Sequence, residues 1–93
     1  MSNVKVVIPA VMASATLGDR AIDISGVTVA EVVSALSARY GEPFKRRVLD
    51  TEGKPRHVLN LYVNGKNVKF LNNLETALVE GDELMLLPAV SGG

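Results

Sequence analysis

A chain of 93 residues is long enough for one domain with a single core, and 47% hydrophobic residues are typical of a globular protein. Ten basic and ten acidic residues give a net charge of zero, which argues against a nucleic-acid-binding protein. The sequence contains no cysteine, which excludes disulfides, thiolate metal sites and cysteine nucleophiles. We therefore expect a single domain over residues 1–93 with no metal site.

Two strands are predicted near the N-terminus. The segment VKVVI at residues 4–8 has the alternation of a strand, and Pro9 ends it because proline cannot donate to a sheet. Residues 10–19 are predicted to be a loop. Residues 20–25 form a second strand, antiparallel to the first.

One main helix is predicted over residues 29–40. Thr28 and Glu31 have the spacing of a capping box, and Gly41 is a typical helix stop. Apolar residues recur at helical spacing and form one stripe, made of Val29, Val32, Val33, Leu36 and Tyr40. This stripe predicts that the helix packs against a sheet.

The rest of the chain is predicted to contain three strands. Residues 42–57 are interpreted as a polar connector with one helical turn at 44–49. Asn64-Gly65 then predicts a tight hairpin between strands 58–63 and 66–70. After a loop with a possible short helical turn, the segment ELMLLP at 83–88 is the last strand.

The predicted order is two strands, one helix and three strands. One helix must then cover one face of a sheet of about five strands, which is an α+β layer pair. A right-handed crossover through the helix fits this order. The pattern therefore predicts the β-grasp fold.

The other face of the sheet is expected to be partly exposed. Side chains alternate along a strand, so Val7, Tyr62, Met85 and Leu87 are predicted to lie on the face that the helix does not cover. Exposed apolar patches usually mark partner surfaces. We expect these four residues to dock a partner protein, with an oligomer contact as the alternative.

The last third of the chain resembles a known family. LYVNGKNVKFLNNLETALVEGDELMLLPAVSGG, residues 61–93, resembles the ubiquitin-like sulfur carriers of the MoaD/ThiS family, which share the β-grasp fold. The most specific parts are YVNG, GDE and the terminal PAVSGG, and the resemblance covers nearly the whole chain. The ending is most similar to that of the CysO-type carriers of cysteine biosynthesis.

The resemblance implies a mechanism at the C-terminus. An E1-like adenylating enzyme uses ATP to couple the terminal carboxylate, here that of Gly93, to AMP. A sulfur donor then displaces AMP and leaves a thiocarboxylate. Partners would recognise a flexible extended tail at about residues 88–93, whose other members are Pro88, Ala89, Val90, Ser91 and Gly92. The carrier would be a protein cosubstrate, with no catalytic residue, cofactor or metal of its own.

Several functions remain open within and beyond this family. A CysO-type carrier implies a cysteine-synthase-type acceptor enzyme and a zinc-dependent peptidase that releases cysteine. The small subunit of molybdopterin synthase and a thiamine-type sulfur carrier are alternatives. Two further alternatives are a ubiquitin-like modifier that forms isopeptide bonds and an interaction module with an inert tail.

Other candidate sites are weaker. His57 is either a ligand or proton shuttle, or a solvated surface residue. Asp82 and Glu83 are either a carboxylate pair or part of a turn into the last strand. A basic cluster could dock an acidic partner or phosphate, or could be a solvated face; it consists of Lys45, Arg46, Arg47, Lys54 and Arg56.

Neither a signal peptide nor a membrane-spanning segment is recognisable in the sequence. Pro9 interrupts the N-terminal apolar stretch early, and no stretch approaches the roughly 18 apolar residues that span a bilayer. We expect a cytoplasmic protein that does not bind membranes.

Overall fold

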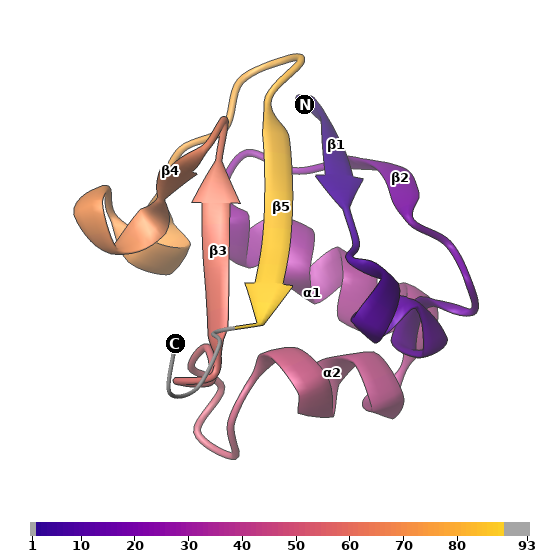
Figure 1. Cartoon of the computed structure of the whole chain (residues 1–93). Coiled ribbons are helices and arrows are strands. Elements are labelled where there is room, and N and C mark those ends of the chain that lie inside the picture. The colour runs from indigo at the N-terminus through magenta and orange to yellow at the C-terminus, as the bar shows by residue number, and fades with distance from the viewer. Residues whose placement is uncertain (1, 89–93) are drawn as a thin grey trace.

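Five strands form a mixed sheet in the order β2-β1-β5-β3-β4 in the computed structural model, which describes residues 2–88 (Figure 1). The strands are β1 (Asn3–Val7), β2 (Ala21–Ser25), β3 (Leu59–Val63), β4 (Lys66–Asn67) and β5 (Glu83–Pro88). β1 and β5 pair in parallel, whereas the other neighbours are antiparallel. The predicted α+β fold with β-grasp strand order is confirmed.

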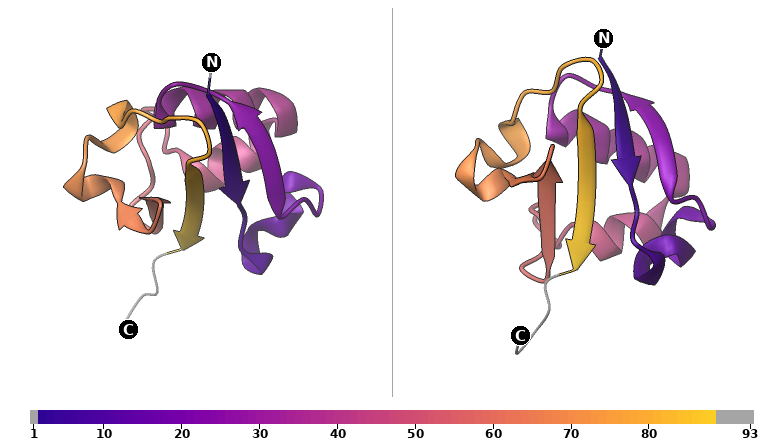
Figure 2. Two further views of the ribbon diagram at one scale, coloured as in Figure 1. Left: turned by 90° about the horizontal axis from the view of Figure 1, so that it is seen from above. Right: turned by 45° about the horizontal axis from the view of Figure 1, so that its top comes forward.

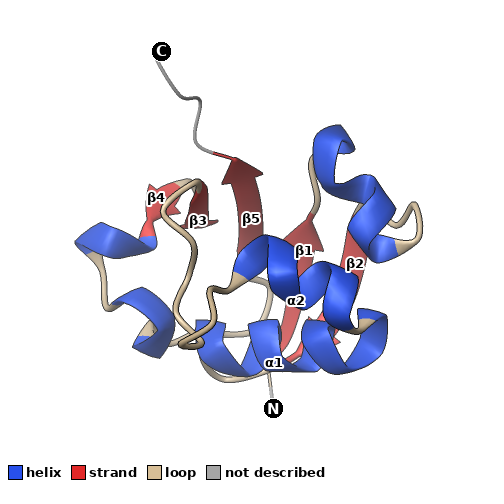
Figure 3. Ribbon diagram, turned by 90° about the horizontal axis from the view of Figure 1, so that it is seen from below, coloured by secondary structure: helices blue, strands red, loops and turns tan. Residues whose placement is uncertain are grey.

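Two α-helices, α1 (Val29–Tyr40) and α2 (Glu42–Val48), lie on the same face of the sheet (Figure 2). Figure 3 shows both helices stacked below the strands, with the opposite face free of helices. Three short 3-10 helices complete the structure: η1 (Ala10–Thr16), η2 (Val68–Phe70) and η3 (Asn73–Glu75). Within residues 2–88, the helices therefore cover the sheet on one face only.

The start of α1 confirms the predicted cap. Thr28 Oγ1 accepts a hydrogen bond from the Glu31 amide at 3.2 Å. The Glu31 carboxylate reaches back to the Val27 amide, also at 3.2 Å, so two amides at the helix start have partners. Gly41 ends the helix with φ +82°, a backbone conformation that side chains disfavour.

The helical turn predicted at 44–49 within the polar connector is part of a longer helix, since residues 42–48 form the two-turn helix α2. Phe44 and Val48 lie one turn apart and are both fully buried, so they anchor this helix to the core. Pro43 lies in the first turn of α2. Backbone amides there have no acceptor within the helix, so the absence of an amide hydrogen in proline breaks no helical hydrogen bond. The same apolar spacing was visible in the sequence among four charged neighbours.

The hairpin after β3 is confirmed, but its second strand is shorter than predicted. Asn64 and Gly65 have φ values of 50° and 85°, as a tight two-residue turn requires. β4 ends at Asn67 because the Asn67 side chain accepts a hydrogen bond from the Lys69 amide at 2.9 Å and starts η2. Val68 then turns into the core, where it is only 4% exposed.

Two N-terminal boundaries also differ from prediction. β1 runs over Asn3–Val7, and Ile8 follows it with its amide donating to the Arg20 carbonyl at 2.9 Å. The predicted loop contains η1, whose Met12 and Ala15 are buried. These two apolar residues, three positions apart, pack the segment against the core.

A single hydrophobic cluster fills the space between the sheet and the helices. Its members come from every strand except β4 and from both α-helices. Alternation along β5 sends Leu84 and Leu86 into this cluster, and both are fully buried. Met85 and Leu87 therefore point to the face without helices.

Candidate functional site

The four predicted docking residues lie together on the face that no helix covers. The strand register places Val7 opposite Met85 and Met85 opposite Tyr62, so one row crosses the three central strands. Leu87 follows two residues further along β5, opposite Asn60. We call Val7, Tyr62, Met85 and Leu87 the outer patch.

The outer patch is partly exposed, as the alternation predicts. Leu87 is 37% exposed, and the other three side chains are half-buried. A charged row borders it, because the register places Asp23 opposite Lys5 and Lys5 opposite Glu83. Sequence reasoning had not identified this row, although the same alternation placed its members on the outer face.

The outer patch reaches the point where the tail begins. β5 includes Pro88, whose register partner is Leu59, so the strand has the predicted bounds of residues 83–88. Proline is tolerated there because β1 pairs with β5 only as far as Met85, so Pro88 lies beyond the parallel ladder. The other predicted tail residues lie outside the described residues: Ala89, Val90, Ser91, Gly92 and Gly93.

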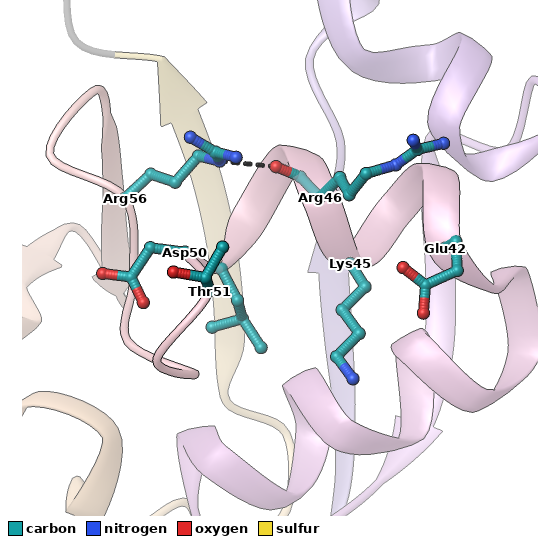
Figure 4. Close-up of a pocket in the computed structure, with 7 residues that line it drawn as sticks. Glu42, Lys45, Arg46, Asp50, Thr51 and Arg56 are labelled. Carbon is teal, nitrogen blue, oxygen red and sulfur yellow. Dashed lines mark hydrogen bonds between the residues drawn. The ribbon is translucent and has the colours of Figure 1, made fainter.

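A second surface feature lies on α2 and the connector that follows it. An open depression of about 410 Å³ is lined by seven residues, shown in Figure 4: Glu42, Lys45, Arg46, Leu49, Asp50, Thr51 and Arg56. Figure 1 places α2 at the end of the sheet toward which β5 runs. The structure thus brings three members of the basic cluster to one depression.

Asp50 organises the connector beside this depression. Its Oδ1 accepts hydrogen bonds from the amides of Lys54 at 3.0 Å and Glu52 at 2.8 Å. The Lys54 amide, followed by the Glu52 amide and the positive charges of Lys54 and Arg56, lowers the pKa of Asp50 below its ordinary value. These contacts favour the ionised form of the carboxylate, and the two hydrogen bonds hold it against the loop.

His57 lines a separate depression of about 330 Å³ beside η3, together with Pro55, Leu59 and Leu74 among others. Among residues 2–88, no group of three His, Asp or Glu side chains is arranged to hold a metal ion. The geometry therefore gives His57 no partners for a ligand set in the described part of the chain.

Asp82 holds the turn into β5. Its carboxylate accepts hydrogen bonds from the Val79 amide and from Asn64 Nδ2, both at 2.9 Å. The Asn64 side chain in turn accepts from the Glu83 amide at 3.0 Å. This network links the hairpin turn to the start of β5 and accounts for Asp82 without a catalytic role.

No helix within residues 2–88 combines the length and the apolar character needed to cross a membrane. The candidate site has two parts, the outer patch on the open face and the basic depression at the end where β5 stops.

Comparison with known proteins supports the resemblance seen in the sequence. The chain is 39% identical over 93 residues to the sulfur carrier protein CysO of Mycobacterium tuberculosis, with 98% of this chain and 99% of the relative covered. A chain in the crystal structure of the Amycolatopsis orientalis BexX/CysO complex superimposes with a TM-score of 0.86 and 36% identity. That match covers 97% of this chain and 99% of the other.

A third similar protein has a different name. The solution structure of small archaeal modifier protein 1 from Methanosarcina acetivorans matches with a TM-score of 0.81 and 33% identity, covering 100% of this chain and 98% of that one. The family model described as the ThiS family matches residues 6–93. From the family model and the near-full-length similarity, the chain belongs to the ThiS family.

Proposed function

We propose that this chain is a sulfur carrier protein, a cosubstrate rather than an enzyme. The observation that supports this most strongly is its 39% identity to a protein named sulfur carrier protein CysO, over 98% of the chain. The central position of β5 adds to it, because β1 and β3 hold the strand that leads to the tail on both sides. A rigid strand of this kind can present the following residues to another protein.

The chemistry takes place at the Gly93 carboxylate. One of its oxygens attacks the α-phosphorus of ATP in the active site of an E1-like partner, and pyrophosphate leaves. Hydrosulfide, or a donor that supplies sulfur at that oxidation state, then attacks the carbonyl carbon of the acyl adenylate. The C–S bond forms, the C–O bond to AMP breaks, and a thiocarboxylate remains. Gly92 and Gly93 carry no Cβ, which permits close backbone approach in a narrow active site.

The acceptor of the sulfur is proposed from the CysO similarity. It is a cysteine-synthase-type enzyme in the cytoplasm, and a zinc-dependent peptidase then releases cysteine from the tail. ATP is consumed by the activating partner, and the carrier itself binds no cofactor.

Intact-mass spectrometry tests the proposal directly. The purified chain is incubated with ATP, sulfide and the E1-like enzyme of its own genome. We expect an adenylylated species followed by a species with one oxygen replaced by sulfur. A chain lacking Gly92 and Gly93 is the matched control and should remain unmodified. If the full chain also remains unmodified with every such enzyme of that genome, the proposal is wrong.

Gly93→Ala tests the role of the C-terminal residue separately from the stability of the domain. The domain should unfold at the same denaturant concentration as the wild type, because residues 2–88 are unchanged. ATP–pyrophosphate exchange with the activating enzyme should fall, because the added methyl group hinders approach to the nucleotide. Equal exchange rates for the two proteins would contradict the assigned role of Gly93.

The outer patch is proposed as the surface that docks the activating partner. Met85 lies at its centre, between Val7 and Tyr62. Met85→Asp places a charge in the contact, and we expect affinity for the partner to fall about tenfold or more. Titration calorimetry measures the affinity, and thermal unfolding checks the fold. Unchanged affinity would contradict the docking role.

A second candidate is a protein modifier, favoured by the 33% identity to small archaeal modifier protein 1 over the whole chain. In that case the activated Gly93 forms an isopeptide bond with a lysine amine instead of accepting sulfur. Affinity enrichment of the tagged chain from cells separates the two functions. High-mass conjugates support the modifier, and free chain with the oxygen-to-sulfur mass change supports the carrier.

A further inference from the structure

The positive charge of this chain is concentrated in one short stretch. Five of the ten basic residues lie between positions 45 and 56, although the whole chain has a net charge of zero. Only Asp50 and Glu52 are acidic within the same stretch. The molecule therefore has a basic region that its net charge conceals.

Local packing holds the basic cluster at the surface. Phe44 and Val48 turn the apolar side of α2 inward, so Lys45, Arg46 and Arg47 are exposed. Arg56 is fixed beside them, because its amide donates to the Val48 carbonyl at 3.0 Å and its Nε donates to the Arg46 carbonyl (Figure 4).

The cluster keeps an excess of positive charge, since three cations and two carboxylates, those of Glu42 and Asp50, line the depression. Arg47 Nη2 donates to the Val11 carbonyl at 3.1 Å, and Arg56 Nε likewise donates to a carbonyl. Both acceptors are neutral. The Asp50 carboxylate accepts two backbone amides at Oδ1, and the charges of Lys54 and Arg56 act on it as well. Cations with neutral acceptors remain available to an outside anion.

The basic cluster lies near Pro88, the last residue of β5. The Arg56 carbonyl accepts a hydrogen bond from the Leu59 amide at 3.1 Å, and Leu59 is the register partner of Pro88. By contrast, Glu80, Asp82 and Glu83 lie at the other end of β5, about 20 Å away for a strand of six residues. The two ends of β5 therefore differ in charge.

We infer that the basic cluster binds an acidic protein surface around the entrance through which a partner receives the tail. Carboxylates of the partner contact Lys45, Arg46 and Arg56 at the rim of the depression. The opposite charge of the two ends orients the chain during approach, with the tail toward the partner. The inference rests on the proposed function for the insertion of the tail, but the charge contact can be measured separately.

The first experiment uses the activating enzyme. Association rates are measured by stopped-flow at low and high salt for the wild type and for Lys45→Glu/Arg46→Glu. We expect the double variant to associate about tenfold or more slowly at low salt and to approach the wild-type rate at high salt. Lys66→Glu, an exposed lysine on β4 near the acidic end, is the control and should stay within about twofold of the wild type.

The second experiment does not require that the chain carry sulfur. ¹⁵N-labelled chain is titrated with a hexaglutamate peptide, and separately with inorganic phosphate, and amide shifts are followed by NMR. We expect the peptide to shift amides within residues 42–56, and Lys45→Glu/Arg46→Glu to lose most of that response. If the thiocarboxylate never forms but these shifts appear, the proposed function fails and the acidic contact stands.

Three results would overturn the inference. The first is an equal salt dependence of association for the double variant and the wild type. The second is peptide-induced shifts that centre on Lys66 or scatter over the whole surface. The third is a larger response to phosphate than to the peptide, which would assign the cluster to a phosphate ligand.

Discussion

The two faces of β5 both carry long apolar side chains, but one face is buried and the other is partly exposed to solvent. Leu84 and Leu86 are fully buried beneath the helices, whereas Met85 is half-buried and Leu87 is 37% exposed on the open face. Hydrophobicity alone would not distinguish them, since four long apolar side chains follow one another. Coverage by the helices makes the difference. The inner pair stabilises the fold, and the outer pair is proposed to contact a partner.

The largest expected effect separates these two faces directly. Leu86→Ala removes a fully buried side chain, and we expect the free energy of unfolding to fall by about 2–5 kcal/mol. Met85→Ala on the same strand should cost about 1 kcal/mol or less, because that side chain is only half-buried. Urea denaturation measures both. Equal losses would show that the outer face contributes to stability as the inner face does.

A smaller effect is expected where α1 joins the covered face. A Cβ atom on Gly26 would lie 2.8 Å from Val32 Cγ2 and 3.2 Å from the Val32 amide nitrogen. Val32 is fully buried and stiff, so Gly26→Ala should destabilise the domain by about 1–3 kcal/mol.

A double-mutant cycle checks this explanation. Val32→Ala removes the methyl group that the new Cβ would meet, so Gly26→Ala should cost less in that background. Chemical denaturation of the four proteins gives the coupling energy. If the two losses are simply additive, contact with Val32 is not the cause.

The cap of α1 should have the next smaller effect. Thr28→Ala removes the oxygen that accepts from the Glu31 amide, and we expect a loss of about 1 kcal/mol in thermal or urea unfolding. Thr28→Ser keeps that oxygen and should be close to the wild type. A serine variant as unstable as the alanine variant would assign the effect to the lost methyl group instead.

The smallest effect concerns the exposed connector and its pH dependence. The pKa of Asp50 is lowered in the folded chain, so its contribution is present above about pH 4 and is lost as pH falls through the lowered pKa. Hydrogen exchange at the Glu52 and Lys54 amides should accelerate over that range, relative to unprotected amides. Asp50→Asn keeps an acceptor oxygen without the titration, and its relative protection should not change with pH.

The main elements could be predicted because several local signals agreed. The Thr28–Glu31 cap, the Asn64-Gly65 turn and the alternation along β5 each have a local cause, and each appears in the structure. Alternation also predicted one face for Val7, Tyr62, Met85 and Leu87, provided that their strands are neighbours, and the strand order β1-β5-β3 meets that condition.

The elements that were predicted incompletely or not at all depend on tertiary contacts. α2 has seven residues, too few to be a stable helix alone, and it forms because the core buries Phe44 and Val48. η1 likewise depends on the burial of Met12 and Ala15. The sequence suggested the basic cluster as a group. The depression that three of its members line required α2, so that geometry could not be foreseen.

The pairing of β5 has a mechanical consequence. A partner that draws on the chain beyond Pro88 pulls along the axis of β5, which is bonded to β1 on one side and to β3 on the other. Such a force loads both rows of backbone hydrogen bonds in shear, so they must break together rather than one at a time. The domain should therefore resist unfolding when it is pulled from this end.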